Sequence, residues 1–79
     1  MRMQVLIRLK PGVLDVQGKA IENGVPSIGF SGVSDVRVGK LIEFNMEGTA
    51  DQATAKVKDL CEKLLANTVI ENFEIKVVE

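Results

Sequence analysis

The sequence predicts an α+β domain whose strands and helices follow one another in the order βαββαβ. Three observations lead to this prediction. Apolar residues alternate with polar ones near the N-terminus, recur at helical spacing in the second half of the chain, and alternate again near the C-terminus. The chain has 79 residues, a length typical of one small domain, so we expect a single domain over residues 1–79.

The first strand is predicted over residues 3–9, where every second residue is apolar and Pro11-Gly12 ends the run. A helix is predicted over residues 15–28, with an aspartate at its start as the N-cap. Pro26 opposes a regular helix, because an internal proline removes a hydrogen bond and clashes with the preceding turn, at a cost of about 3 kcal/mol. We therefore expect this helix to be kinked, or to restart near Pro26.

Two further strands are predicted over Val33–Val38 and Leu41–Glu47. The Gly-Lys pair between them suits a two-residue hairpin, but that register would mix apolar and charged side chains on one face. Pairing Val38 with Ile42 makes the face consistently apolar, and burial of that face should decide the register. A three-residue loop or a bulge is therefore predicted near Gly39 to Leu41.

The second helix has the clearest signals, because Thr49 and Gln52 form a capping box and Asn67 is a plausible stop. Its apolar stripe consists of Ala53, Val57, Leu60, Cys61, Leu64 and Leu65. The last strand is predicted over Glu71–Val78. Its inner face would carry Phe73, Ile75 and Val77.

This order of elements resembles ferredoxin-like domains, in which a four-stranded antiparallel sheet carries both helices on one face. The outer face of that sheet would then carry Leu6, Arg8, Arg37, Leu41, Glu43, Glu74 and Lys76. Leu6 and Leu41 would be apolar residues facing water, which is a weak indication of a partner on that face.

Charge and composition exclude several classes of protein. Ten basic and eleven acidic residues give a net charge of −1, whereas a nucleic-acid-binding protein usually needs a basic excess to neutralise phosphates. The chain has no histidine, the commonest general base and a common metal ligand. Phe44 and Phe73 are assigned to the core face, so base stacking of the RNA-recognition type is not expected.

The small size of the domain favours self-association. A chain of this length buries only about 60–65% of the surface that its unfolded form exposes. Cys61 is the only cysteine, so an intramolecular disulfide cannot supplement the core, and we expect a homodimer or homotetramer. The N-terminus does not resemble a signal peptide and no apolar run is long enough to span a membrane, so we expect a cytoplasmic protein that binds no membrane.

Catalytic machinery is not evident in the sequence. Cys61 lies on the apolar stripe of the second helix and has no histidine to activate it, so we interpret it as a structural residue. The carboxylates are dispersed, and none stand at a spacing that indicates a metal site. Two glycine-lysine turns, at residues 10–12 and 38–40, do not match the P-loop pattern. We expect no catalytic residue, metal or cofactor on this chain.

Three stretches resemble the PurS family, the small subunit of phosphoribosylformylglycinamidine synthase. They are LKPGVLDVQGKAI (Leu9–Ile21), VSDVRVGKLIEF (Val33–Phe44) and CEKLLANTVIENFEI (Cys61–Ile75), and with the matching length and element order the resemblance covers essentially the whole chain. The family commonly has proline where Val16 and Thr68 stand here. The stretch around Pro26 is also unusual, because family members keep that segment helical.

The resemblance implies a PurS-like fold and a non-catalytic subunit of an enzyme complex, a glutamine-dependent C–N ligase of de novo purine biosynthesis. Such a subunit would bridge a large PurL-type synthetase and a PurQ-type glutaminase, and would support the transfer of ammonia released from glutamine. ATP and magnesium would belong to the large subunit, with no cofactor on this chain. Whether the homo-oligomer is a dimer or a tetramer stays open.

The resemblance also indicates a partner interface built from the two turn motifs. Its candidate residues are Lys10, Pro11, Gly12, Asp15, Gln17, Gly18, Arg37, Gly39 and Lys40. A purely structural role is an equal alternative for Gly12, Gly18 and Asp15, which could shape turns and cap a helix. The alternative function is a stand-alone ferredoxin-like regulatory module that binds a small metabolite between protomers, and a small enzyme is the third interpretation.

Overall fold

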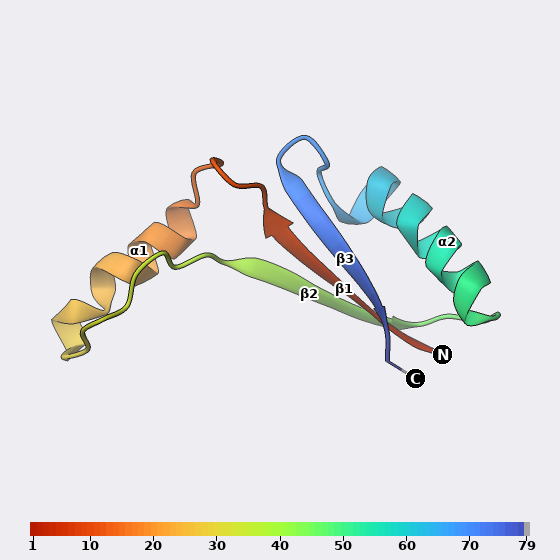
Figure 1. Cartoon of the computed structure of the whole chain (residues 1–79), viewed down its shortest axis with the longest axis horizontal. Coiled ribbons are helices and arrows are strands. Elements are labelled where there is room, and N and C mark those ends of the chain that lie inside the picture. Colours follow the sequence, from red (N-terminus) through yellow and green to blue (C-terminus); the bar gives the residue numbers. More distant parts are fainter. Residues whose placement is uncertain (79) are drawn as a thin grey trace.

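The structure is a computed structural model that describes residues 1–78. Its α+β class agrees with the prediction, and the described molecule is elongated, with extents of 48 × 27 × 15 Å (Figure 1). The elements are β1 (Arg2–Leu9), α1 (Val16–Gly24), a 3₁₀ turn (Pro26–Ile28), β2 (Gly39–Asn45), α2 (Ala50–Leu60) with a π-helical turn (Cys61–Leu65), and β3 (Glu71–Val77).

Strand β1 is the centre of a three-stranded antiparallel sheet of order β2-β1-β3. The predicted alternation is confirmed, because Met3, Val5 and Ile7 are almost completely buried while the residues between them are more exposed. Val5 lies opposite Ile42 on β2 and opposite Ile75 on β3, so apolar residues of all three strands share one face.

Helix α2 covers that face and supplies the other half of the core (Figure 1). The predicted capping box is confirmed, with Gln52 N donating to Thr49 Oγ1 at 3.2 Å. Ala53, Val57 and Cys61 are fully buried at a spacing of four residues. The prediction for Leu64 was wrong, because this side chain is 75% exposed. The π-helical turn over Cys61–Leu65 changes the helical period there, and Leu64 leaves the apolar stripe.

The predicted strand Val33–Val38 is absent from the described residues, so the sheet has three strands instead of four. This segment lies beside α1, and two of its amide groups donate to carboxylates instead of to a neighbouring strand. Val36 N donates to Glu22 Oε1 at 3.0 Å, and Val38 N donates to Asp15 Oδ2 at 2.7 Å. Asp35 also interrupts the extended backbone, because its φ of 54° lies in the left-handed region.

The predicted loop or bulge near Gly39 to Leu41 was also wrong. These residues begin β2 and pair regularly with β1, with Leu41 opposite Leu6 and Lys40 opposite Ile7. The prediction assumed that the segment before Gly39 was the partner of β2. With β1 as the partner, Val5 lies opposite Ile42 and Met3 opposite Phe44 without any bulge.

The predicted placement of both helices on one face of the sheet was wrong for α1. Figure 1 shows α1 beyond one end of the sheet, on the opposite side from the two chain termini.

The predicted interruption near Pro26 is confirmed, since α1 ends at Gly24 and Pro26 opens a 3₁₀ turn. We call residues 11–38 the arm, and the sheet with α2 the body.

The arm exposes large apolar side chains. They are Leu14 (74% exposed), Val16 (70%), Ile21 (46%), Ile28 (72%), Phe30 (63%) and Val33 (48%). The outer face of the sheet also lacks a cover among residues 1–78, and Leu41 is 51% exposed there. A surface of this kind on so small a protein is typical of an interaction site.

Candidate interaction surface

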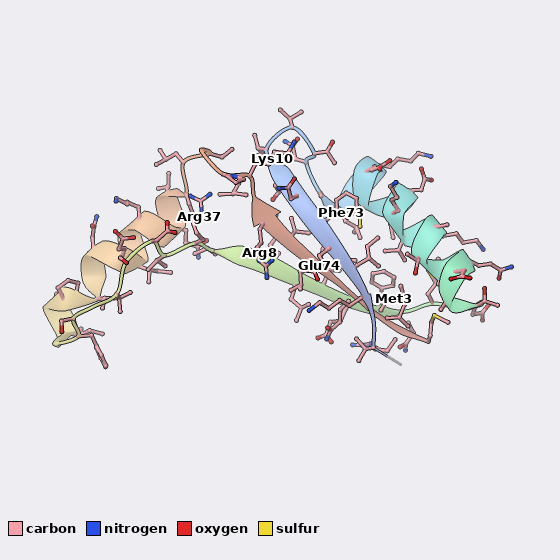
Figure 2. All side chains as sticks on the ribbon, viewed as in Figure 1. Met3, Arg8, Lys10, Arg37, Phe73 and Glu74 are labelled. Carbon is pink, nitrogen blue, oxygen red and sulfur yellow. The ribbon has the colours of Figure 1, made fainter. Side chains whose placement is uncertain are left out.

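The chain passes between body and arm twice, and both passages lie side by side. The first, the outgoing passage, follows β1 through Lys10, Pro11 and Gly12 to the start of α1. The second runs through Arg37 into β2. We call residues 33–38, which lead back to β2, the return segment. We call residues 10–18 together with residues 35–40 the joint. Figure 2 shows Arg37 where the arm meets the sheet and Lys10 at the neighbouring end of β1.

Asp15 is the central side chain of the joint. It caps α1, as predicted, by accepting a hydrogen bond from Gly18 N at 2.7 Å. Its second oxygen accepts from Val38 N, also at 2.7 Å, and the residue is only 7% exposed. These two backbone hydrogen bonds, led by that from Val38, together with the charge of Arg37, outweigh desolvation and lower the pKa of Asp15.

Arg37 links the return passage to the outgoing one. Its Nη2 donates to Val13 O at 3.1 Å and to Lys10 O at 3.4 Å, while its Nε lies 3.9 Å from Asp15 Oδ2. One guanidinium therefore contacts two carbonyl groups and a carboxylate. These contacts within the chain give Arg37 a structural role in addition to any role at a surface.

At two positions of the joint, the backbone of another segment lies so close that only glycine fits. A Cβ atom on Gly18 would lie 2.4 Å from Val36 O, so α1 and the return segment touch through this residue. A Cβ on Gly39 would lie 2.7 Å from Ile7 O, at the first residue pairs of the β1–β2 ladder. Gly12 is required for another reason, because its φ of +86° is a conformation that other residues rarely adopt.

The remaining candidate residues are more exposed. Pro11 and Gln17 are exposed, and Lys40 Nζ lies 3.9 Å from Glu71 Oε2 with its side chain 67% exposed. Lys10 is partly buried, and its amide donates to Ile70 O at 2.8 Å, which attaches the joint to the turn before β3. These groups are available to a partner to a greater degree than Asp15 and Gly18.

Of the shallow hollows at the joint, two are lined by most of the candidate residues. One has a volume of about 450 Å³ and is lined by Pro11, Gly12, Arg37 and Gly39, together with Arg8 and Asp35. The other has a volume of about 340 Å³ and is lined by Asp15, Gln17, Gly39, Lys40 and Glu71. The two sequence motifs, separated by about twenty residues, therefore form one continuous surface. All nine predicted residues belong to it or lie directly beside it.

Sequence reasoning missed Glu22. Its Oε1 accepts the Val36 amide, and this hydrogen bond, aided by the Lys19 charge, outweighs desolvation and lowers the pKa of Glu22. Glu22 and Asp15 are seven residues apart, two helical turns, so both carboxylates face the return segment. The spacing was visible in the sequence, but its meaning depended on knowing that Val33–Val38 lies against α1.

Two further observations concern metal binding and the thiol. Among residues 1–78, no group of three or more cysteine, aspartate or glutamate side chains could hold a metal ion. Burial, together with the nearby charge of Glu62, raises the pKa of the Cys61 thiol, which keeps it in the unreactive protonated form.

Within residues 1–78, every helix is too short or too polar for a membrane crossing.

Comparison with known proteins decides the family. The family model described as "PurS: Phosphoribosylformylglycinamidine (FGAM) synthase" matches residues 2–79. The chain belongs to the PurS family. Among PurS proteins, the subunit from Synechocystis sp. is 46% identical over 80 residues, an alignment that covers 96% of this chain and 79% of that protein.

Solved PurS structures share the fold. The structure of Bacillus subtilis PurS superposes with a TM-score of 0.87 at 42% identity, covering 99% of this chain and 98% of that one. A chain of the structure named PurLQS from Thermotoga maritima superposes with a TM-score of 0.79 at 26% identity, covering 95% and 93%. Membership of the PurS family, predicted from sequence motifs, and the α+β fold, predicted from the hydrophobic periodicity, are thus confirmed.

We predict that Gly18→Ala destabilises the protein by about 1–3 kcal/mol, because the new methyl group overlaps Val36 O and forces α1 away from the return segment. Gly24→Ala is the matched control within the same helix. Its Cβ meets nothing within 4 Å, so it should stabilise the protein by about 0.4–1 kcal/mol. Urea unfolding followed by far-ultraviolet circular dichroism measures both changes, and equal stability of the two variants would contradict the prediction.

We also predict that acid weakens the arm. Because the folded pKa values of Asp15 and Glu22 are lowered, their contribution is complete above the unfolded values of about 3.9 and 4.3, and is lost as the pH falls through the lower folded values. The urea midpoint of the wild type should therefore fall below about pH 4 more steeply than that of the Asp15→Asn, Glu22→Gln double variant. Parallel pH profiles would refute this.

Proposed function

We propose that this chain is the non-catalytic small subunit of phosphoribosylformylglycinamidine synthase in de novo purine biosynthesis. In this role it joins a large PurL-type synthetase subunit to a PurQ-type glutaminase subunit and supports the transfer of ammonia between them. The observation that carries the proposal is the match of nearly the whole chain to the PurS family. The Thermotoga maritima PurLQS structure supports association with the other two subunits.

The chemistry of the described residues supports a role in assembly. The thiol of Cys61 is buried in the core, and the carboxylate of Asp15 is occupied by two backbone amides. A docking subunit needs a defined shape and surface, both of which the joint and the exposed arm provide. We place ATP and magnesium on the large subunit, with no cofactor on this chain, and the complex in the cytoplasm.

The joint is the surface that we propose for contact with a partner subunit. Lys40, Gln17 and Pro11 are exposed around its hollows, and Lys10 lies beside them. Asp15, Gly18 and Gly39 would act indirectly, because close contacts within the chain already occupy them. The lysines are therefore the residues whose replacement should affect docking without disturbing the fold.

The decisive measurement is synthase activity of the cognate large subunit and glutaminase, with and without this chain. We expect glutamine-driven turnover to require the chain and ammonia-driven turnover to proceed without it, because only the first reaction needs ammonia to pass between subunits. The Lys10→Ala, Lys40→Ala double variant should reduce complex formation and glutamine-driven turnover. Its matched control is Lys56→Ala, Lys58→Ala, which removes two exposed cations from α2.

Two outcomes would contradict the proposal. If glutamine-driven turnover is the same without the chain, it is not the coupling subunit. If the Lys10, Lys40 variant docks and supports turnover as the control does, the partner surface lies elsewhere on the molecule. Both variants should unfold at the wild-type urea concentration, since none of these four lysines is buried and surface charges contribute little to stability.

A homo-oligomer is the second part of the proposal. The arm exposes Ile28 and Phe30 at 72% and 63%, and nothing in the described chain covers them. The return segment also has one side bonded to α1 carboxylates, which leaves its other backbone edge open to a strand from elsewhere. A second copy of the chain would cover both features, and we propose a homodimer, or a homotetramer built from such dimers.

Sedimentation equilibrium tests this assembly, with interference optics because the chain has no tryptophan or tyrosine. We expect the wild type to sediment as a dimer or tetramer, and Ile28→Asp, Phe30→Asp to shift it toward monomer by placing charges in an apolar contact. Leu64→Asp is the matched control, because Leu64 is an equally exposed apolar residue of the body. A wild-type monomer at every concentration would refute the proposal.

A further inference from the structure

Strand β3 forms one open edge of the sheet within residues 1–78 (Figure 1). It is seven residues long, contains neither proline nor glycine, and pairs with β1 in a regular register without a bulge. Natural proteins often interrupt such an edge with a proline or a bulge, because its unpaired backbone groups are a template for another strand. The edge of β3 carries neither interruption and can therefore accept a further strand.

The hydrogen bonds at the two ends of β3 decide which of its backbone groups point away from β1. Lys10 N donates to Ile70 O at 2.8 Å, and Val78 N donates to Arg2 O at 2.9 Å. Backbone groups alternate along an antiparallel strand, so the even-numbered residues between these two points also face β1. The outward amide and carbonyl groups, which have no hydrogen-bond partner within residues 1–78, therefore belong to Phe73, Ile75 and Val77.

A second copy of β3 matches this edge in one register. Two antiparallel copies must place outward residues opposite outward residues, which centres the pairing on a single residue of β3. Centred on Ile75, the pairing sets Glu74 of each copy opposite Lys76 of the other, so two opposite-charge pairs form by symmetry. Centred one residue earlier it sets Glu74 opposite Glu74, and one residue later Lys76 opposite Lys76. Both of these pairings are repulsive, so charge selects the register centred on Ile75.

The same register matches the apolar side chains of β3. Phe73 and Ile75 pack against the core under α2 but are only half-buried, and Val77 beside them is 42% exposed. The pairing places Phe73 of each copy opposite Val77 of the other, and the two Ile75 residues opposite each other. Two three-stranded sheets then become one continuous sheet of six strands, with both α2 helices on the same face.

The opposite edge of the sheet, β2, lacks this self-complementarity. Its charged residues are Lys40 and Glu43. Their positions differ by three, so their side chains point to opposite faces of the sheet. They cannot stand opposite each other when two copies of β2 pair with matching faces. The edge that suits a second copy is therefore β3.

We propose that β3 pairs edge to edge with β3 of a second copy, in the antiparallel register centred on Ile75. This contact belongs to the body and uses no residue of the arm, so it is distinct from the apolar contact through Ile28 and Phe30. Two different two-fold contacts on each chain close into a tetramer. The inference thus extends the proposed homo-oligomer by a second contact, selects the tetramer over the dimer, and does not depend on the coupling function.

Disulfide trapping tests the register. Chains carrying Glu74→Cys and chains carrying Lys76→Cys are refolded together and oxidised. Opposite residues of this kind of pair have Cα atoms about 4.5 Å apart, a distance that a disulfide can bridge. We expect a disulfide-linked dimer on a non-reducing gel, in clear excess over what either variant forms alone. Native Cys61 is fully buried and should not react.

The matched control for trapping is Glu43→Cys mixed with Lys76→Cys. Glu43 is an exposed glutamate like Glu74, but it lies on the other edge strand. This mixture should give only the background level of disulfide.

Charge exchange tests the same contact without a covalent link. Glu74→Lys sets lysine opposite lysine twice, and should raise the dissociation constant of the contact about tenfold or more. The exchanged variant Glu74→Lys, Lys76→Glu restores two opposite-charge pairs and should recover the wild-type constant. Sedimentation equilibrium measures both in a chain that also carries Ile28→Asp, Phe30→Asp, so that the contact through β3 is followed with the arm contact weakened.

Either of two results overturns the proposal. If the mixture of Glu74→Cys and Lys76→Cys gives no more disulfide than the control, the edges do not pair in this register. If Glu74→Lys and the exchanged variant have the same dissociation constant, the two charges do not stand opposite each other. Neither result bears on glutamine-driven turnover, which is measured with the other subunits. Neither bears on the arm contact, which Ile28→Asp, Phe30→Asp tests in the otherwise wild-type chain, so the failures are distinguishable.

Discussion

The geometry of the arm depends on one carboxylate. Asp15 begins α1 by capping it, and the same side chain receives the amide of Val38, twenty-three residues later in the chain. Without a cap, the N–H groups at the start of α1 would lack acceptors. Without a partner, the amide groups of the return segment would lack acceptors too. A single buried acid resolves both problems and thereby brings the start and the end of the arm together. Glu22 repeats the arrangement two turns further along α1.

The body is organised by a different constraint, the shortage of apolar surface in a chain of 79 residues. One strand, β1, provides Met3, Val5 and Ile7 to the core, and one helix, α2, covers them. All fully buried apolar side chains of the described chain belong to this two-layer unit, and Ala66, which is 8% exposed, follows directly after its helical part. The arm contributes almost nothing to the core. Its apolar residues are directed outward, which is the expected arrangement for a subunit whose role is contact with other chains.

Local signals in the sequence predicted the elements of the body well. The alternation in β1, the capping box at Thr49 and the stripe of Ala53, Val57 and Cys61 each depend on neighbours within one or two turns, and the structure confirms them. Pro26 was likewise a reliable signal of an interrupted helix, because the effect of proline is local. The nine candidate interface residues come from two motifs that the fold brings together, and their role in docking stays a prediction.

The fourth strand and the position of α1 could not be predicted in this way. Val33–Val38 has a composition that suits a strand, but a strand needs a neighbour. In this chain Glu22 and Asp15 accept the amides of Val36 and Val38 instead. The register of β2 was misjudged for the same reason, since the true partner is β1 and not the preceding segment. Local composition does not specify which of several remote groups will satisfy a backbone donor.

The sequence by itself determined the family and the element types of the body, because motifs, caps and periodicities are properties of short stretches. Only the tertiary structure decided that the sheet has three strands, that α1 stands away from it, and that Asp15 and Arg37 connect the two passages of the chain. These features arise from contacts between residues that are distant in sequence. Each backbone donor and each apolar face has several possible partners in the folded chain. Which partner it finally contacts depends on the whole fold, so no single segment of the sequence specifies it.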